Sequence, residues 1–275
     1  MRVDSHHHFW DPARRTYPWM GAELDRIRMR FGPEELEPLA KSAAIDRTVL
    51  VQTVSSVSET REFLATADAH ELIGGVVGWV DLMDDRVADT IADLKAAPGG
   101  RKLVGIRHQV HDEADAEWLL RDDVQRGVAA VGAAGLAYDL LVRPRELPAA
   151  VETAKRHPEM RFVLDHAAKP RIAKGARDPD WEDAMYPLAD LPNVTCKLSG
   201  LVTEANWADW STEQLKPYVS LILSWFGTQR CMFGSDWPVC LMAASYAQVV
   251  DSIRSFTGDD EDVFGGVAAR AYKLI

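Results

Sequence analysis

Short runs of apolar residues alternate along the chain with segments whose apolar residues recur at helical spacing. Runs such as 48–51 and 162–164 are almost continuously apolar, which is typical of strands buried on both faces of a parallel sheet. The pattern predicts strands at residues 2–8, 47–53, 74–80, 103–108, 136–142, 161–166, 194–199 and 231–235.

Helical periodicity fills the intervals between these runs. Apolar residues stand at i, i+4 and i+7 in two clear cases, which are Val87, Ile91 and Leu94 in one segment and Leu215, Val219 and Ile222 in another. Pro33 is placed to begin a helix, and Ser56 with Glu59 has the spacing of a capping box. The sequence therefore predicts a helix after most of the strands.

Strands that alternate regularly with helices predict an α/β protein with a parallel sheet. Eight such units favour a single closed (β/α)8 barrel of the TIM type over residues 1–275, with an open doubly wound sheet as the alternative. The length of 275 residues is close to the roughly 250 of such a barrel. Long connections at 9–32 and 200–211 follow the first and seventh strands, which places both on the catalytic face of a barrel.

Composition narrows the classes of function. The chain has 31 basic and 42 acidic residues, a net charge of −11, and no basic stripe, which argues against nucleic-acid or anionic-membrane partners. No segment has the apolar length of a membrane span, and the N-terminus lacks the apolar stretch of a secretion signal. The three cysteines, an odd number without a C-x-x-C motif, suggest neither a disulfide framework nor a zinc knuckle. We expect a cytoplasmic protein that acts on a small molecule.

The strongest chemical signal is the run His6-His7-His8 in the first strand. Residues two apart in a strand point to the same side, so His6 and His8 project together and His7 projects oppositely. Two imidazoles on one face at a strand end form a ready site for a divalent metal. Three unrelated histidines are the alternative interpretation of this run.

Two further motifs end the sixth and eighth predicted strands. Asp236 follows the eighth strand, beside the first strand in a closed barrel, where it could bind a metal or take a proton from water. His166 is the last residue of the sixth strand, where it could hold substrate, donate a proton or bind the same metal. A helix-capping aspartate and a structural core histidine are the plain alternatives for these two residues.

Other polar residues at the same ends of the strands predict a polar pocket, because a charge inside an apolar strand needs a partner or a wet cavity. Aromatic residues crowd the connections on the same side and could contact a sugar ring or a planar lactone. The candidates for binding substrate are Arg107, His108, Tyr138, Asp139, Lys169, Lys197, Trp10 and Trp237. Strand parity allows only one of Arg107 and His108 to face inward. A structural ion pair or rim packing is the alternative for each of them.

Four segments in order carry a family resemblance: 4–11, 105–108, 164–170 and 233–238. Together they resemble the amidohydrolase superfamily, and more narrowly its amidohydrolase-related branch. That branch contains sugar lactonases, such as the L-fuconolactonases, and the 2-pyrone-4,6-dicarboxylate lactonases. The likeness runs along nearly the whole chain.

The resemblance implies a hydrolase that opens a sugar lactone to its hydroxy acid. Asp236 would activate water, while His6, His8 and His166 would polarise the lactone carbonyl or, with Asp236, hold one divalent metal such as zinc. Arg107, Lys169 or Lys197 would stabilise the oxyanion or grip the product carboxylate. Strands four and five lack the bridging Lys or Glu and the histidine of many relatives, so no binuclear centre is expected. The branch includes metal-independent members, so the resemblance is compatible with both a metal-dependent and a metal-independent reaction.

Three other functions remain as alternatives. A dicarboxylate lactonase would need several arginines in the pocket, and a metal-dependent decarboxylase of the same superfamily would share the histidine and aspartate pattern. A barrel that binds ligands without catalysis is the third, and the intact set of His6, His8, His166 and Asp236 argues against it.

Overall fold

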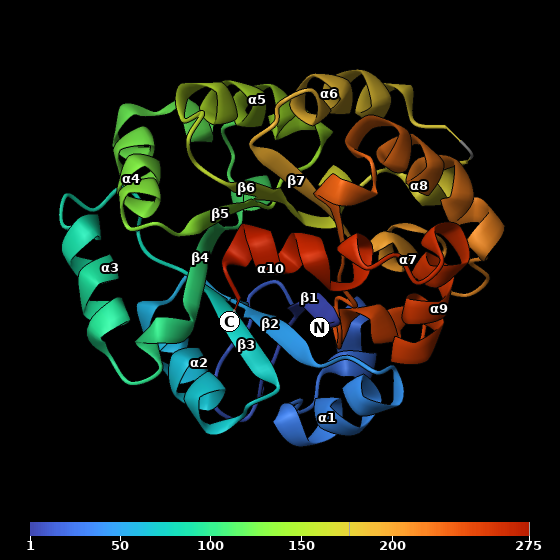
Figure 1. The fold of residues 1–275 in the computed structure, drawn as a ribbon, viewed down its shortest axis with the longest axis horizontal. Coiled ribbons are helices and arrows are strands. Elements are labelled where there is room, and N and C mark those ends of the chain that lie inside the picture. Colours follow the sequence, from blue (N-terminus) through green and yellow to red (C-terminus); the bar gives the residue numbers. More distant parts are fainter. Residues whose placement is uncertain (176, 275) are drawn as a thin grey trace.

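The computed structural model describes residues 1–175 and 177–274 as a ring of parallel strands surrounded by helices (Figure 1). The strands run in sequence order from β1 to β8, each hydrogen-bonded to the next. Their bounds are β1 Val3–His7, β2 Arg47–Val51, β3 Ile73–Gly78, β4 Leu103–His108, β5 Ala137–Leu140, β6 Phe162–Leu164, β7 Val194–Leu198 and β8 Cys231–Phe233. The predicted (β/α)8 barrel is confirmed, and the open doubly wound sheet is wrong.

Helices follow the strands, and most of them cover the outside of the ring, whereas the last helix lies across one end. They are α1 Pro33–Ser42, α2 Val57–Ala69, α3 Val87–Ala96, α4 Asp122–Ala133, α5 Leu147–Arg156, α6 Pro179–Ala189, α7 Leu201–Glu204, α8 Thr212–Phe226, α9 Tyr246–Thr257 and α10 Val267–Tyr272. Each predicted periodic triplet of apolar residues is buried against the barrel. Among the described residues, no helix is both long and apolar enough to cross a membrane.

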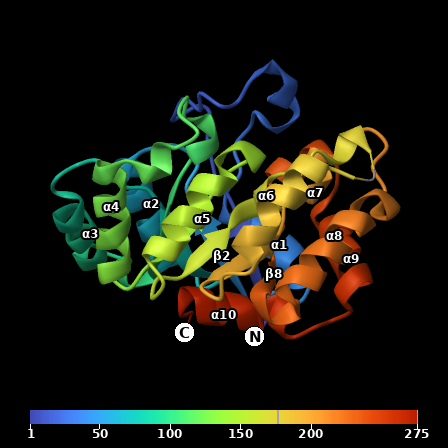
Figure 2. The same ribbon diagram turned by 90° about the horizontal axis from the view of Figure 1, so that it is seen from above.

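Helix α10 closes the amino-terminal end of the barrel. It lies across the centre of the ring in Figure 1 and below it in Figure 2, opposite the connection that follows β1. Its residues Val267, Ala268 and Ala271 pack in one cluster with inward valines of the strands, among them Val49 and Val163. This apolar plug leaves the carboxyl ends of the strands as the open end of the barrel.

Extra residues in β1 and β4 decide which side chains enter the barrel. The β1–β2 register moves from Asp4 opposite Thr48 to His7 opposite Leu50, so β1 carries one more residue than its partner. Such a bulge shifts the alternation of side chains by one position. Val3 packs inside the barrel, and the bulge lets His6 rather than His7 face inward above it.

The connections at the open end are long where the sequence predicted them. Residues 8–32, with a 3-10 turn at Ala22–Ile27, stand above the barrel in Figure 2. The segment after β7 contains the short helix α7. A third long connection, 109–121 after β4, was not predicted. At the start of α2, Ser56 accepts from the amide of Glu59, but the Glu59 carboxylate bonds Thr53 and Val54, so only half of the predicted capping box forms.

Candidate active site and metal centre

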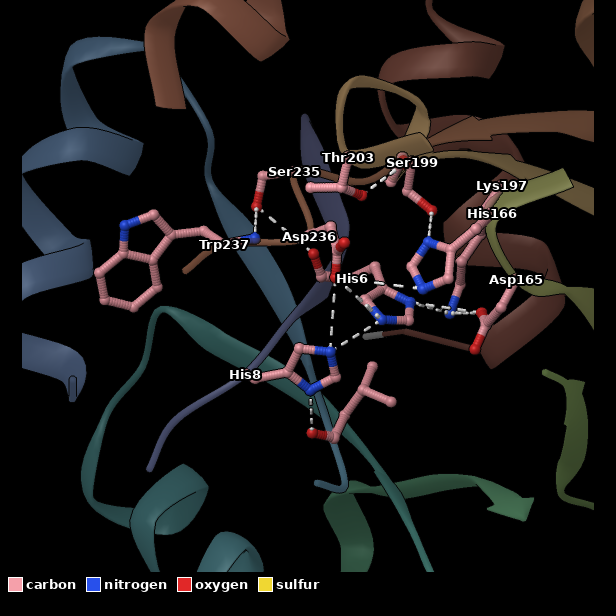
Figure 3. A network of polar contacts seen from close by, with 12 residues as sticks. His6, His8, Asp165, His166, Lys197, Ser199, Thr203, Ser235, Asp236 and Trp237 are labelled. Atoms are coloured by element: carbon pink, nitrogen blue, oxygen red, sulfur yellow. Dashed lines mark hydrogen bonds and ion pairs between the residues drawn. The ribbon is translucent and has the colours of Figure 1, made fainter. Parts of the chain in front are cut away.

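Three imidazoles converge on one carboxylate at the open end of the barrel (Figure 3). The Nε2 atoms of His8, His6 and His166 lie 3.5, 3.8 and 4.0 Å from Oδ1 of Asp236. The Nε2 atoms of His6 and His8 are 3.1 Å apart. All four side chains are nearly or fully buried. The structure thus brings together the four residues that the sequence singled out.

Each of two histidines is held through its other ring nitrogen by a neutral group. Nδ1 of His8 lies 2.8 Å from the carbonyl oxygen of Val51, and Nδ1 of His166 lies 2.9 Å from Oγ of Ser199. Partners at Nδ1 fix the orientation of a ring and aim Nε2 at the site, as in many metal centres. The sequence pattern did not indicate Ser199, although this residue is the last of the seventh predicted strand and directly follows β7.

The backbone at the site is unusual. His166 and Asp236 both adopt left-handed conformations, with φ of 51° and 55°, and residues 166–169 all have positive φ. This region is unfavourable for residues with a side chain, and such strain concentrates at functional sites. Gly200 packs against the ring, because a Cβ at this position would lie 2.5 Å from Nδ1 of His166. The fold therefore forces the two residues into place.

The donor set fits a single divalent metal. His6, His166 and Asp236 each offer a ligand atom, and these atoms lie within 4.8 Å of one another. Ligands of a tetrahedral zinc ion, each about 2.0–2.2 Å from the metal, lie about 3.4 Å apart. The separations from Asp236 of 3.5 to 4.0 Å need only small movements to reach this spacing. His8 is the fourth group that can close the set.

Burial and neighbouring charges set the protonation of the group. Burial lowers the pKa of His166 to about 4 and that of His6 well below its usual value, so both rings are neutral near pH 7. Burial by itself raises the pKa of Asp236, but His166, His8 and Lys169 outweigh it and leave this pKa below its usual value. Asp236 is therefore a carboxylate at neutral pH, as a proton acceptor must be.

A buried ionic network lies beneath the histidines. Nζ of Lys197 lies 2.7 Å from Oδ2 of Asp139 and 2.8 Å from Oδ1 of Asp165. Arg107 donates to Asp165 at 2.9 Å, and Tyr272 of α10 donates to Asp139 at 2.6 Å. Burial raises the pKa of Asp139 to about 6, whereas Lys197, His6 and Arg107 overcome the effect of burial on Asp165 and hold its pKa well below the usual value.

The family model described as amidohydrolase matches residues 3–274. The chain belongs to this amidohydrolase family. It is 40% identical over 282 residues to an L-fucono-1,5-lactonase of Burkholderia ambifaria, and the match covers 99% of this chain and 96% of the relative. An L-fucono-1,5-lactonase of Burkholderia multivorans is also 40% identical, with 100% of this chain and 96% of the relative covered. A crystal structure of an amidohydrolase from Burkholderia multivorans with bound zinc has a TM-score of 0.94 at 39% identity, with both chains covered completely.

Two acidic residues of this amidohydrolase were not predicted from the sequence. Asp165 ends the sixth apolar run directly before His166, which was the available signal. Asp4 joins the first and last motifs, because it accepts from the amide of Ser235 at 2.8 Å and from the hydroxyl of Tyr246 at 3.0 Å. Burial raises the pKa of Asp4 to about 6. No sequence pattern indicates these long-range partners.

Four predicted substrate-binding residues of the amidohydrolase are held by packing or hydrogen bonds to other side chains and backbone, and two of them lie on strands. His108 stacks on Trp118, accepts from Trp79 and bonds Glu113, and Arg107 is the member of its pair that points inward. Tyr138 is fully buried in the layer between strands and helices. A substrate contact does not fit these positions, because alternate residues of a strand point to opposite sides.

The other two are tryptophans, which are packed as structural residues. Figure 3 shows the Trp237 ring turned away from the histidines, and it contacts Phe31. The Trp10 ring stacks beside the His8 ring, with ring centroids 6.5 Å apart, and its Nε1 donates to the carbonyl of Ile27. Trp10 also borders a separate cavity of about 360 Å³ beside α2, whose lining includes none of His6, His8, His166 and Asp236. Lys169 pairs with Glu204 but is partly exposed. A ligand can therefore reach Lys169, whereas Arg107 and Lys197 are buried.

Proposed function

We propose that this amidohydrolase opens the lactone ring of a sugar acid, and that L-fucono-1,5-lactone is the first substrate to test. The observation that carries the proposal is the convergence of His6, His8 and His166 on the ionised Asp236. Relatives at 40% identity over almost the whole chain are L-fucono-1,5-lactonases, which supports this choice of substrate.

The proposed reaction uses Asp236 as the base. Its carboxylate accepts a proton from the attacking water as the water oxygen bonds to the lactone carbonyl carbon. The bond from that carbon to the ring oxygen then breaks, and the ring oxygen takes the proton from Asp236 to become a hydroxyl group. When bound by the four side chains, a divalent metal supplies polarisation of the carbonyl and acidifies water.

The three cationic side chains have different roles in the proposed reaction. Arg107 and Lys197 are buried and occupied by carboxylates, so in this proposal they support the site from below instead of touching the ring. Lys169 lies at the rim and attracts the carboxylate that forms on ring opening. A dicarboxylate lactonase would need free arginines, and both terminal nitrogens of Arg107 are occupied, one by Asp165 and the other by the carbonyl of Gln52.

The test is a pH-indicator assay of acid release from sugar 1,5- and 1,4-lactones, with spontaneous hydrolysis measured in the presence of the Asp236→Asn variant. Rapid release from L-fucono-1,5-lactone supports the proposal. Turnover of 2-pyrone-4,6-dicarboxylate alone, or carbon dioxide release from an aromatic acid, would overturn it. A parallel arm with chelator determines whether the reaction requires a metal.

The proposal also includes a cytoplasmic location. The three cysteines are free thiols, and Cys196 and Cys231 are partners in adjacent strands β7 and β8. Free buried thiols suit a reducing compartment. Fractionation of the native host, with the protein detected by antibody, tests the location.

A further inference from the structure

A hydrogen-bond donor and a hydrogen-bond acceptor both lie beside Nδ1 of His6. Nζ of Lys197 lies 3.1 Å from this nitrogen, and Oδ1 of Asp165 lies 3.3 Å from it. A lysine ammonium only donates hydrogen bonds, and a carboxylate only accepts them. A neutral imidazole carries one ring proton, so Nδ1 can satisfy Asp165 when protonated or Lys197 when unprotonated, and never both.

The contact at Nε2, on the other side of the His6 ring, also depends on which ring nitrogen carries the proton. Nδ1 of His8 faces the carbonyl oxygen of Val51, so a neutral His8 has its lone pair at Nε2. This atom lies 3.1 Å from Nε2 of His6. Two lone pairs at that distance repel, so the contact needs either a proton on Nε2 of His6 or a cation between the rings.

The structure therefore supports two complete arrangements. In one, Lys197 donates to Nδ1 of His6, and Nε2 of His6 donates to His8. In the other, Nδ1 of His6 donates to Asp165, and the lone pair at Nε2, which Nη1 of Arg107 approaches at 3.5 Å, can bind a metal. Lys197 keeps Asp139 and Asp165 as partners in both arrangements, because it contacts both carboxylates at 2.7 and 2.8 Å.

We propose that Lys197 and Asp165 compete for Nδ1 of His6, and that Lys197 keeps the affinity of the site for divalent metal low. A metal-bound histidine usually donates its other N–H to a carboxylate or carbonyl, which raises its basicity. Asp165 matches this role, and Lys197 opposes it by drawing the proton to Nε2 and by placing a positive charge behind the ring. Both are positioning residues that act through His6.

The inference rests on the metal-holding role of His6 in the proposed function. Its test uses zinc affinity without substrate, so a failure of the lactonase assay leaves the result interpretable. The charge-matched double variant Lys197→Met with Asp139→Asn removes the competing donor without leaving a buried unpaired charge. Zinc affinity is measured by competition with a chromophoric chelator at pH 8.

We expect the double variant to bind zinc about tenfold or more tightly than the wild type, and Asp165→Asn to bind it about 10–100-fold more weakly. Tyr272→Phe is the control, since it removes a bond to Asp139 without changing either group at His6, and its affinity should stay within about threefold of the wild type. Equal or weaker zinc binding by a folded double variant would overturn the proposal, as would a site in which no variant binds zinc.

A second measurement reads the position of the proton on His6 in the unsubstituted protein. Nitrogen-15 NMR of histidine-labelled, chelator-treated protein at pH 8 reports which nitrogen of His6 is protonated, with signals assigned from single-histidine variants. The expected proton is on Nε2, bonded to His8. A proton on Nδ1 in the metal-free protein would overturn the competition.

Discussion

The backbone amide of Asp236 donates a hydrogen bond of 2.8 Å to the carbonyl oxygen of His6. The amide of His8 donates in turn to the carbonyl of Trp237 at 2.7 Å. These bonds join the end of β8 to β1 and so complete the ring of strands. The same contacts that close the barrel also place the carboxylate beside the histidine pair, so closure of the fold and assembly of the site are one event.

Asp236→Asn keeps the shape of the side chain but removes its ability to accept a proton at neutral pH. We expect turnover of the lactone to fall by about 10²–10⁴-fold, the range for loss of a general base. The melting temperature should change little, because the backbone bond to His6 remains. Wild-type turnover by a folded variant would exclude the proposed mechanism.

Substitutions at His7 and His8 test which side chains at the end of β1 face the site. His8→Asn removes a group that lies 3.5 Å from Asp236, and we expect kcat/KM to fall at least about 100-fold. His7→Asn is the matched control, since His7 points outward and bonds Thr48. It should lower stability and leave kcat/KM within about threefold of the wild type. Equal losses of activity in the two folded variants would contradict the placement of the bulge.

Gly200→Ala is expected to displace His166, because the new Cβ would lie 2.5 Å from Nδ1 of the ring. We expect kcat/KM to fall about tenfold or more, as happens when a reacting group is misplaced by a fraction of an ångström. Gly135→Ala provides the control, since Gly135 also has a left-handed φ, of 75°, but no atom of residues 1–175 and 177–274 lies within 4 Å of the added Cβ. That variant should lose only about 1–2 kcal/mol of stability and keep its activity. Similar kcat/KM values for the two variants would remove the role assigned to Gly200.

Tyr138→Phe distinguishes packing from substrate contact. The hydroxyl of Tyr138 is buried and has no hydrogen-bond partner among the described residues, so its removal should leave stability unchanged or raise it. Thermal unfolding and KM are measured together. A raised KM with unchanged kcat would instead support a contact between Tyr138 and the substrate.

The buried Glu59 predicts a pH-dependent stability difference. Burial raises the pKa of Glu59 despite bonds from Thr53 and Val54. A carboxyl group whose folded pKa is raised contributes stability below its unfolded pKa, and this contribution is lost as pH rises through the folded pKa. The advantage of the wild type over Glu59→Gln should thus be larger at pH 4, below the unfolded pKa of about 4.3, than at pH 8, by up to about 1.4 kcal/mol for each pH unit by which the pKa is raised. Urea unfolding at both values measures it, and a larger advantage at pH 8 would contradict the burial argument.

Local patterns along the chain are sufficient to predict the barrel, because alternating apolar runs and helical periodicity depend only on nearby residues. They also single out His6, His8, His166 and Asp236, since polar residues at the ends of buried strands must share one end of a parallel barrel. Period-2 alternation alone pairs His6 with His8 on one face of the first strand. These inferences need only spacing along the chain.

Packing in three dimensions sets which side of each strand faces inward and what each side chain meets there. The bulges in β1 and β4 turn His6 and Arg107 into the barrel, and a one-residue shift of register leaves the composition of a strand unchanged. Asp165 and Lys197 become partners of His6 only when β6 and β7 close around β1. Such contacts join residues far apart in the chain, so packing, and not local pattern, selects them.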